Sequence, residues 1–237
     1  MLGRVVCLAL VSTCLIHVQT VAAQDGERAE EWTGEWVFMA GWQRLDVDGL
    51  NDRLRTSGFP SFPAGVLSLG GGGWAFKDRF LIGGNGHALL AREQTTSDGT
   101  FRANLAGGYG QVDLGYRLYT NERLDVYPIA GFGAGAMTLE IVEQGSATFD
   151  EILGNPLTMS RLSSWGFLFD LAAAADVRVT GAGEDEGTGE APGGGFSMGI
   201  RVGYTFWPGD WEWDVPGGPE FAVRGLYVRA MVGGWAR

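Results

Sequence analysis

Apolar and polar positions alternate with a period of two along several long stretches of the chain. This is the pattern of β-strands whose two faces lie in different surroundings. In residues 165–178, the odd positions are aromatic or aliphatic, whereas the even positions include Asp170, Asp176 and Arg178. Residues 196–206 repeat the pattern, with apolar residues at the even positions. The alternation predicts eight strands in residues 35–45, 64–75, 80–92, 101–119, 124–141, 165–178, 196–206 and 221–235.

The connections between the predicted strands alternate in length. Residues 76–79 and 120–123 form tight turns, whereas residues 46–63, 143–163 and 208–219 are longer loops. An even number of antiparallel strands, with short turns at one end and long loops at the other, is typical of single-chain bacterial membrane barrels. The chain is therefore predicted to be all-β: one antiparallel up-and-down transmembrane barrel of about eight strands.

Three connections add detail to this scheme. Val47, Leu50 and Leu54 have helical spacing, so the first long loop is predicted to contain a short helix. A helical turn is also predicted near residues 149–153. The stretch 181–194 occupies the place of a short turn, yet it is long, acidic and rich in glycine. It is either an insertion or a sign that the strand number differs by a pair, which would give ten strands.

The first 23 residues have the pattern of a secretory signal peptide. Arg4 supplies the positive charge, residues 5–18 form the apolar core, and small residues precede the expected cleavage after Ala23. Both cysteines lie in this segment, so the mature chain is expected to contain no disulfide. Lipidation at Cys14 is disfavoured, because the bulky Thr13 precedes it.

Composition narrows the class of protein further. After cleavage, 16 basic residues face 28 acidic residues, a net charge of −12, which argues against nucleic acid as a partner. No apolar run approaches the ~18 residues of a membrane helix, so a membrane-spanning chain must be a closed barrel. Residues 24–33 are predicted to be a short acidic N-terminal segment, and residues 34–237 the barrel domain.

Aromatic residues gather at the ends of the predicted strands. Two belts of such rings, one at each membrane interface, are expected of a barrel in lipid. The alternative is that these rings form the core of a soluble sandwich, or of a soluble periplasmic barrel that holds a ligand. The belt at the turn end would contain Trp36, Trp74, Phe76, Phe80, Tyr116, Tyr119, Tyr127 and Trp235, and the belt at the loop end would contain Trp42, Trp165, Phe206 and Trp207.

Charged and polar residues on the inward strand faces are the first candidates for a functional site. A barrel of about eight strands is only wide enough for side chains to fill, and buried charges there need partners. One interpretation is an internal salt-bridge plug. The other is a selectivity or binding site for a small charged solute. The predicted lumen network consists of Gln111, Asp113, Arg117, Asp170, Asp176, Arg178, Arg201 and Arg229.

His87 is the single histidine of the mature chain, and strand parity places it on the inward face with Asn85. Histidine is the most frequent general acid or base, so His87 is the weak candidate for a catalytic residue. Ser68, Ser197 and Asp170 are conceivable partners, although their spacing in the sequence does not bring them together. A lone histidine in a strand is more often structural.

Other motifs predict no chemistry. Three glycine clusters begin at Gly70, Gly83 and Gly131, but no Lys-Ser/Thr pair follows them and none links a strand to a helix, as a phosphate-binding loop requires. The acidic clusters at Asp46 and at residues 184–186 lack the spacing of a calcium loop. The sequence therefore predicts neither a metal site nor a cofactor.

Four segments resemble parts of outer-membrane β-barrel proteins, of the small OmpA-like and porin-like kind found in Gram-negative envelopes: residues 67–73, 115–119, 127–133 and 225–229. The resemblance implies a meander barrel inserted by the barrel-assembly machinery, which reads a C-terminal strand that ends in an aromatic residue. Trp235 is the candidate, although two further residues follow it. Members of this group range from inert anchors to pores and enzymes, so the resemblance specifies location better than task.

The leading hypothesis is a non-enzymatic protein of the cell outer membrane that makes surface contacts through its extracellular loops. Trp211 and Trp213 look most suited to adhesion, because aromatic residues are enriched at interfaces; alternatively, they extend the outer aromatic belt. A second hypothesis is a narrow pore for small solutes, and a third is a lipid-modifying enzyme centred on His87. Expected partners are outer-membrane lipid and lipopolysaccharide, while the oligomeric state stays open.

Overall fold

A computed structural model describes residues 32–144, 159–180 and 194–236. The predicted signal peptide and the helical turn near residues 149–153 lie outside this part of the chain. So does nearly all of the acidic stretch 181–194.

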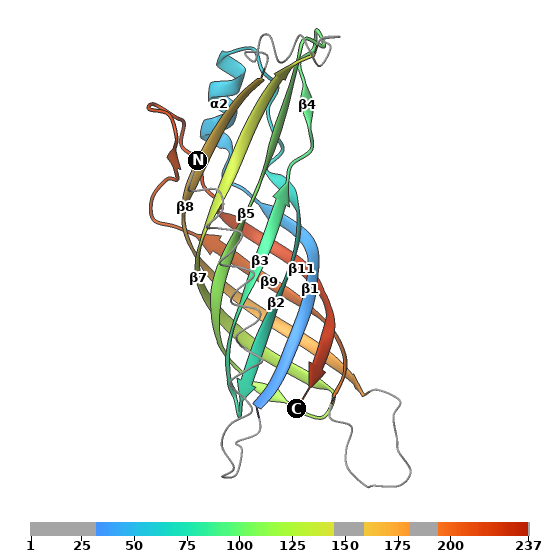
Figure 1. Ribbon diagram of the computed structural model, residues 1–237. Coiled ribbons are helices and arrows are strands. Elements are labelled where there is room, and N and C mark those ends of the chain that lie inside the picture. The colour runs from blue at the N-terminus through green and yellow to red at the C-terminus, as the bar shows by residue number, and fades with distance from the viewer. Residues whose placement is uncertain (1–31, 145–158, 181–193, 237) are drawn as a thin grey trace.

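Eight long strands form one closed antiparallel barrel (Figure 1). Each strand pairs with the next in the chain, and the last pairs with the first, so no long strand is left at an edge. Three short strands extend the sheet: β4 (Gln94–Thr95) on β5, β6 (Tyr119–Thr120) on β7, and β10 (Glu212–Trp213) on β8. The long strands are β1 (Trp32–Arg44), β2 (Gly65–Lys77), β3 (Phe80–Leu90), β5 (Phe101–Tyr116), β7 (Leu124–Glu143), β8 (Met159–Thr180), β9 (Gly194–Phe206) and β11 (Gly225–Ala236).

The predicted fold class is confirmed, with eight long strands rather than ten. The helix predicted in the first long loop is also present, as α2 (Asp48–Thr56). The prediction was wrong about the ends of several strands: β5 ends at Tyr116 and not at residue 119, and β11 begins at Gly225 and not at residue 221. Residue 143 and residues 159–163 were assigned to a loop, but they extend β7 and β8 beyond the rest of the barrel. Polar residues interrupt the apolar alternation there, so the sequence pattern marks the end of the apolar surface and not the end of hydrogen bonding.

The outer wall of the barrel is a continuous apolar belt. Every outward side chain from Trp165 to Val179 on β8, and from Phe196 to Phe206 on β9, is aliphatic or aromatic. The outward positions of β3 between Phe80 and Leu90 carry only apolar side chains or glycine. Polar outward residues begin only near the strand ends. A closed barrel with such a belt satisfies every strand hydrogen bond within itself, as a hydrocarbon environment demands.

Among the described residues, no helix has both the length and the apolar character needed to cross a membrane.

The predicted aromatic belt at the turn end is only partly correct. Trp36, Phe80, Tyr116 and Tyr119 do point outward and are exposed. By contrast, the side chains of four other residues assigned to that belt point into the barrel and are buried there. Their position along the strand was right, but they occupy the inward face. These four residues are Trp74, Phe76, Tyr127 and Trp235.

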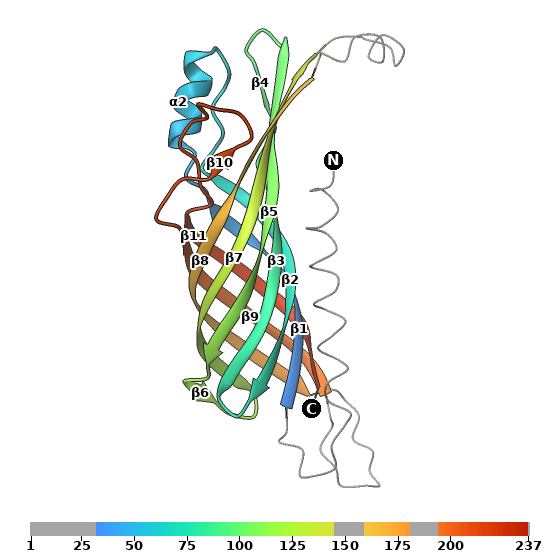
Figure 2. The same ribbon diagram turned by 60° about the vertical axis from the view of Figure 1, so that its left-hand side comes forward.

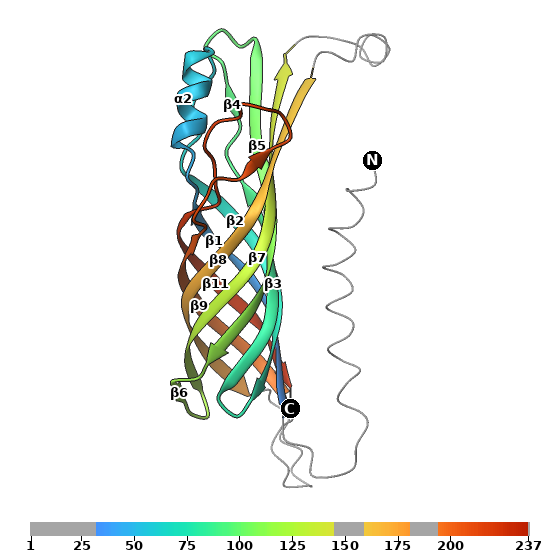
Figure 3. The ribbon, with the colours of Figure 1, turned by 90° about the vertical axis from the view of Figure 1, so that its left-hand side faces the viewer.

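The end of the barrel that carries the long loops, here called the loop end, is itself a folded structure. α2 and β10 lie side by side there, whereas β6 and the end of β11 lie at the opposite, turn end (Figures 2 and 3). α2 places Leu50 and Leu54 against a core that also contains Phe62 and Phe221. The Asn51 side chain fixes the return of the chain, because it donates to the Phe62 carbonyl at 2.9 Å and accepts from the Phe62 amide at 2.8 Å.

Candidate functional site

Side chains fill the lumen in alternating apolar and polar layers. One apolar cluster occupies the loop-end half and continues into α2; it includes Leu89, Leu105 and Leu168. A second apolar cluster lies towards the turn end and includes Met39 and Trp74. A polar group lies between these clusters, and another lies near the turn end. The polar residues that the sequence predicted to face inward therefore lie at two separate levels of the barrel.

Arg201 organises the central polar group. Its Nη1 lies 2.8 Å from Asp113 Oδ2, its Nη2 lies 2.6 Å from Asp170 Oδ2, and its Nε donates to the Tyr227 hydroxyl at 2.9 Å. The side chains of Arg201 and both aspartates are fully buried. Gln111 donates to both carboxylates. One guanidinium thus pairs with two carboxylates in a fully buried position, and such pairing is the condition under which buried charges are tolerated.

Neutral donors complete the coordination of Asp113. Trp74 Nε1 donates to Asp113 Oδ2 at 3.0 Å, and Asn85 Nδ2 donates to the same oxygen at 2.6 Å. The inward direction of Trp74, which the sequence analysis missed, is explained by this bond, because a buried indole N–H requires an acceptor. The acceptor comes from β5, two strands away from the strand that carries the indole.

Arg229 belongs to the same level but forms no ion pair with the described residues. It donates to Gln43 Oε1 at 2.5 Å and to the Tyr109 hydroxyl, and its guanidinium lies 3.7 Å from the centre of the Tyr227 ring. Gln43 and both tyrosines were not among the predicted site residues. The alternation along each strand would have identified them as inward-facing: on β1, for example, Gln43 points inward and its neighbour Trp42 points outward.

The second polar group, near the turn end, is centred on Asp125. Arg178 contacts Asp125 directly, and Arg117 Nη2 lies 3.3 Å from it. The Arg117 guanidinium also lies 3.6 Å from the centre of the Phe76 ring. Asp125 was not predicted, although its parity along β7 would have identified it.

Asp176 and Glu35 belong to the same group. Asp176 accepts a hydrogen bond from Tyr127, and Glu35 accepts one from Ser197 at 2.7 Å. Glu35, like Asp125, was missed. The predicted lumen residues are therefore brought together in two groups, not in one network.

His87 is the second feature of the central level. Its Nδ1 lies 3.1 Å from Ser68 Oγ, and its ring packs against Tyr109 with 5.4 Å between centroids. The other two conceivable partners are engaged elsewhere, Ser197 with Glu35 and Asp170 with Arg201. Both Ser68 and His87 are buried inside the barrel, so their side chains face neither the lipid side nor either opening. A nucleophile and base need access to substrate, which this position does not provide.

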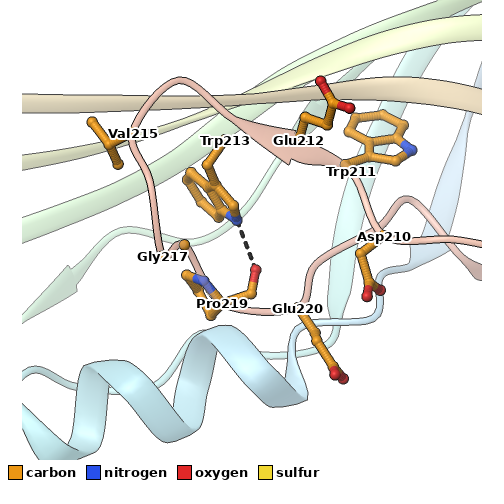
Figure 4. Close-up of a pocket in the computed structure, with 9 residues that line it drawn as sticks. Asp210, Trp211, Glu212, Trp213, Val215, Gly217, Pro219 and Glu220 are labelled. Atoms are coloured by element: carbon orange, nitrogen blue, oxygen red, sulfur yellow. Dashed lines mark hydrogen bonds between the residues drawn. The ribbon is translucent and has the colours of Figure 1, made fainter.

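The loop end offers a second candidate, a hollow and an adjoining cleft. The hollow has a volume of about 360 Å³, is open to solvent and is lined by the loop at 210–220 (Figure 4). Trp213 lies inside this loop and donates to the Pro219 carbonyl at 2.7 Å. The cleft, about 170 Å³, runs from the same tryptophan to α2 and is lined mostly by apolar side chains.

Trp211 does not project as an adhesive side chain, contrary to the sequence-based prediction. It is 3% exposed, donates from Nε1 to the Phe167 carbonyl at 3.0 Å, and packs edge-on against Phe221. A Cβ atom at Gly166 would collide with its indole ring, so the glycine leaves the space that the ring fills. Trp211 therefore neither extends the outer belt nor faces solvent. It anchors the loop in the lumen core.

Within the described residues, no group of three or more His, Cys, Asp or Glu side chains is arranged to hold a metal ion.

The chain is similar to several solved structures, but it matches no known protein family. No protein-family model matches the chain, and no curated protein matches it. Ail, the attachment invasion locus protein of Yersinia pestis, is similar over 87% of this chain and 97% of its own, with 12% identity and a TM-score of 0.43. Neisserial surface protein A is similar over 86% and 94%, with 10% identity and a TM-score of 0.41.

A third similar structure is the transport unit of the autotransporter AIDA-I from Escherichia coli, with 10% identity, a TM-score of 0.34, and coverage of 94% and 97%. Likeness at this level says nothing about partners or activity. The closed eight-stranded architecture is established by the strand pairing of the chain itself. The predicted fold, a closed antiparallel β-barrel of eight long strands, is therefore confirmed.

Proposed function

We propose that this chain is a non-enzymatic outer-membrane protein whose barrel anchors a rigid extracellular platform for binding. The observation that carries the proposal is the core at the loop end. It runs without a break from Leu105 and Leu168 inside the barrel to Leu50 and Phe221 in the loops. Ordering long loops costs conformational entropy, and this burial offsets it. A pre-ordered surface binds with less further loss of entropy.

The apolar belt supports a position in the outer membrane, with lipid and lipopolysaccharide as its surroundings and the barrel-assembly machinery as its route of insertion. Export by a cleaved signal peptide is part of the same proposal. Membrane fractionation with heat-modifiability on a gel tests it. Recovery in the outer membrane with a mobility shift on boiling is expected. Recovery in the soluble periplasm would overturn the location.

The surface role is tested on bacteria that display the protein. The wild type is compared with a variant in which residues 209–219 are replaced by a short Gly-Ser turn, a replacement that changes no residue of the eight long strands, although it removes Trp211 from the lumen core. Adhesion to cultured cells, to immobilised matrix proteins and to neighbouring bacteria is measured at equal surface abundance. The wild type is expected to adhere more strongly than the variant in at least one assay. Equal adhesion in all three would refute the surface role.

The pore alternative has less support, because Arg201 and Arg229 at the central polar level and Met39 in the neighbouring apolar cluster are all fully buried in the lumen. A conducting path would require these layers to separate. The purified protein in planar bilayers is expected to give no steady conductance, and stepwise currents would favour the pore instead.

A further inference from the structure

The cleft at the loop end has the size of a single large side chain. Leu54 of α2 and Phe59 just after the helix form one wall, and the ends of β7 and β8 form the other, with Ile141 and Leu162. A dry apolar cavity of about 150 Å³ takes one benzene ring. The cleft, at about 170 Å³, therefore fits one leucine- or phenylalanine-sized group.

The cleft lies beyond the apolar belt. Its wall residues Leu139 and Ile141 alternate along β7 with Glu140 on the outward face, and Arg161 pairs with Glu140 there. Polar outward residues mark the level at which the wall leaves hydrocarbon. An acyl chain would have to leave the bilayer to reach the cleft. A partner that approaches from the aqueous side has direct access, which favours a protein segment as the occupant.

The loop beside the cleft is strongly acidic. Residues 207–220 contain four carboxylates and no lysine or arginine. Asp210 is partly offset by Arg224 at 3.8 Å, and Arg53 on α2 also lines the cleft. Glu212 and Glu220 are exposed and form no ion pair with the described residues. Such a surface attracts cationic partners within the ~8 Å screening length of physiological salt.

Trp213 connects the apolar cleft with the acidic loop. It lines both the hollow and the cleft, and its bond to the Pro219 carbonyl fixes the indole ring. An indole face is the preferred aromatic surface for a guanidinium or ammonium group. An apolar slot, a tryptophan and an acidic rim thus follow one another along one surface.

We propose that this surface docks a basic segment of a partner protein. The segment inserts one large apolar side chain between α2 and the β7–β8 wall, and it places cationic side chains against Trp213 and the 207–220 loop. The proposal rests on the surface role proposed above and names the chemistry of the partner for it.

Full-length protein in lipid nanodiscs tests the proposal with short synthetic peptides. The first peptide alternates arginine with serine around one central phenylalanine. The second has serine in place of the phenylalanine, and the third has glutamate in place of every arginine. Binding is measured by calorimetry at low and at physiological salt. The first peptide is expected to bind at least about tenfold more tightly than either of the others, and more weakly as salt is raised.

Two variants locate the binding. Ser57 is exposed and lines the cleft, so Ser57→Phe fills the slot without touching the barrel core. Its control, Ser97→Phe, adds the same ring to an exposed turn that does not line the cleft. Ser57→Phe is expected to weaken the first peptide about tenfold, whereas Ser97→Phe leaves its affinity unchanged. Equal affinity in the two variants would exclude the cleft as the site.

Two matched double variants test how much the acidic side chains contribute to peptide binding. Glu212→Gln with Glu220→Gln removes two carboxylates beside the cleft. The control, Glu93→Gln with Glu143→Gln, removes two carboxylates from other exposed positions at the loop end. Only the first pair is expected to reduce affinity, by about fivefold, and to flatten the salt dependence.

Binding of the glutamate peptide, or recovery of an acyl chain in the cleft in place of peptide, would overturn the proposal. If displayed protein still adheres through residues 209–219 while no basic peptide binds, the surface role stands and the partner chemistry is wrong. If adhesion is absent as well, the surface role itself fails.

Discussion

Arg201 shows, at the scale of a single residue, how the lumen tolerates charge. Its guanidinium is completely buried, yet three acceptors satisfy it: Asp113, Asp170 and the Tyr227 hydroxyl. Desolvation of such a group costs several kcal/mol, and the loss is recovered only when every partner is in place. The arrangement therefore contributes to stability only as a complete unit.

Removing that one guanidinium should be severe. Arg201→Met leaves two buried carboxylates without their cation and is expected to lower the free energy of unfolding by about 3–5 kcal/mol. Urea titration of the protein in lipid vesicles, followed by the heat-dependent gel shift, measures the loss. Arg161→Met is the control, because its pair with Glu140 is partly exposed and should contribute only about 0–1 kcal/mol. Similar losses in the two variants would contradict the assigned role of Arg201.

His87 should prove structural. Its ring packs over Gly70, where a Cβ atom would collide with it, and it contacts Ser68. His87→Ala is expected to leave envelope lipids unchanged in mass spectra, while the free energy of unfolding falls by about 2 kcal/mol because a cavity is opened. A changed lipid A mass in cells that express the wild type but not the variant would instead support the enzymatic hypothesis.

At the scale of elements, α2 is held in place by packing and by one side-chain amide. The helix is short, and helices of this length are marginal in isolation. Leu50 and Leu54 supply the apolar face, and Asn51 fixes the chain that returns from the helix to β2. The long walls β7 and β8 give the helix a surface to pack against. The platform is therefore an extension of the barrel sheet and not a separate domain.

Loss of the Asn51 amide should loosen this platform locally. Asn51→Ala removes both hydrogen bonds to Phe62 and leaves that backbone pair unsatisfied in a half-buried position, a cost of about 1–3 kcal/mol. Amide exchange in residues 48–62 is expected to accelerate, while the barrel strands stay protected. Thr56→Ala is the control, since its hydroxyl bonds only along the exposed helix. Faster exchange across all strands would indicate that the platform and the barrel unfold together.

At the scale of the whole molecule, the outer wall decides where the protein resides. Leu171 lies in the belt, points outward and is 57% exposed. Leu171→Arg is expected to destabilise the barrel in bilayers by about 2–4 kcal/mol, because a cation near the bilayer centre loses hydration. Asn104→Arg, outward on β5 near the loop end, should have little effect. Folding yield in lipid vesicles compares the two, and equal yields would show that the belt is not in contact with hydrocarbon.

The sequence by itself predicted about eight strands, the direction of most side chains and the helix in the first loop, because alternation and helical spacing are local properties, whereas the strand pairing decided between eight strands and ten. The tertiary structure alone decided which inward residues meet. Arg201 and Asp113 lie 88 positions apart, and their contact depends on closure of the barrel. The curved sheet also brought Trp74 to Asp113, two strands away, and the pairing of β10 with β8 gave Trp211 a place over Gly166. A strand pattern records which face a residue occupies, but only the closed sheet determines what lies opposite that face.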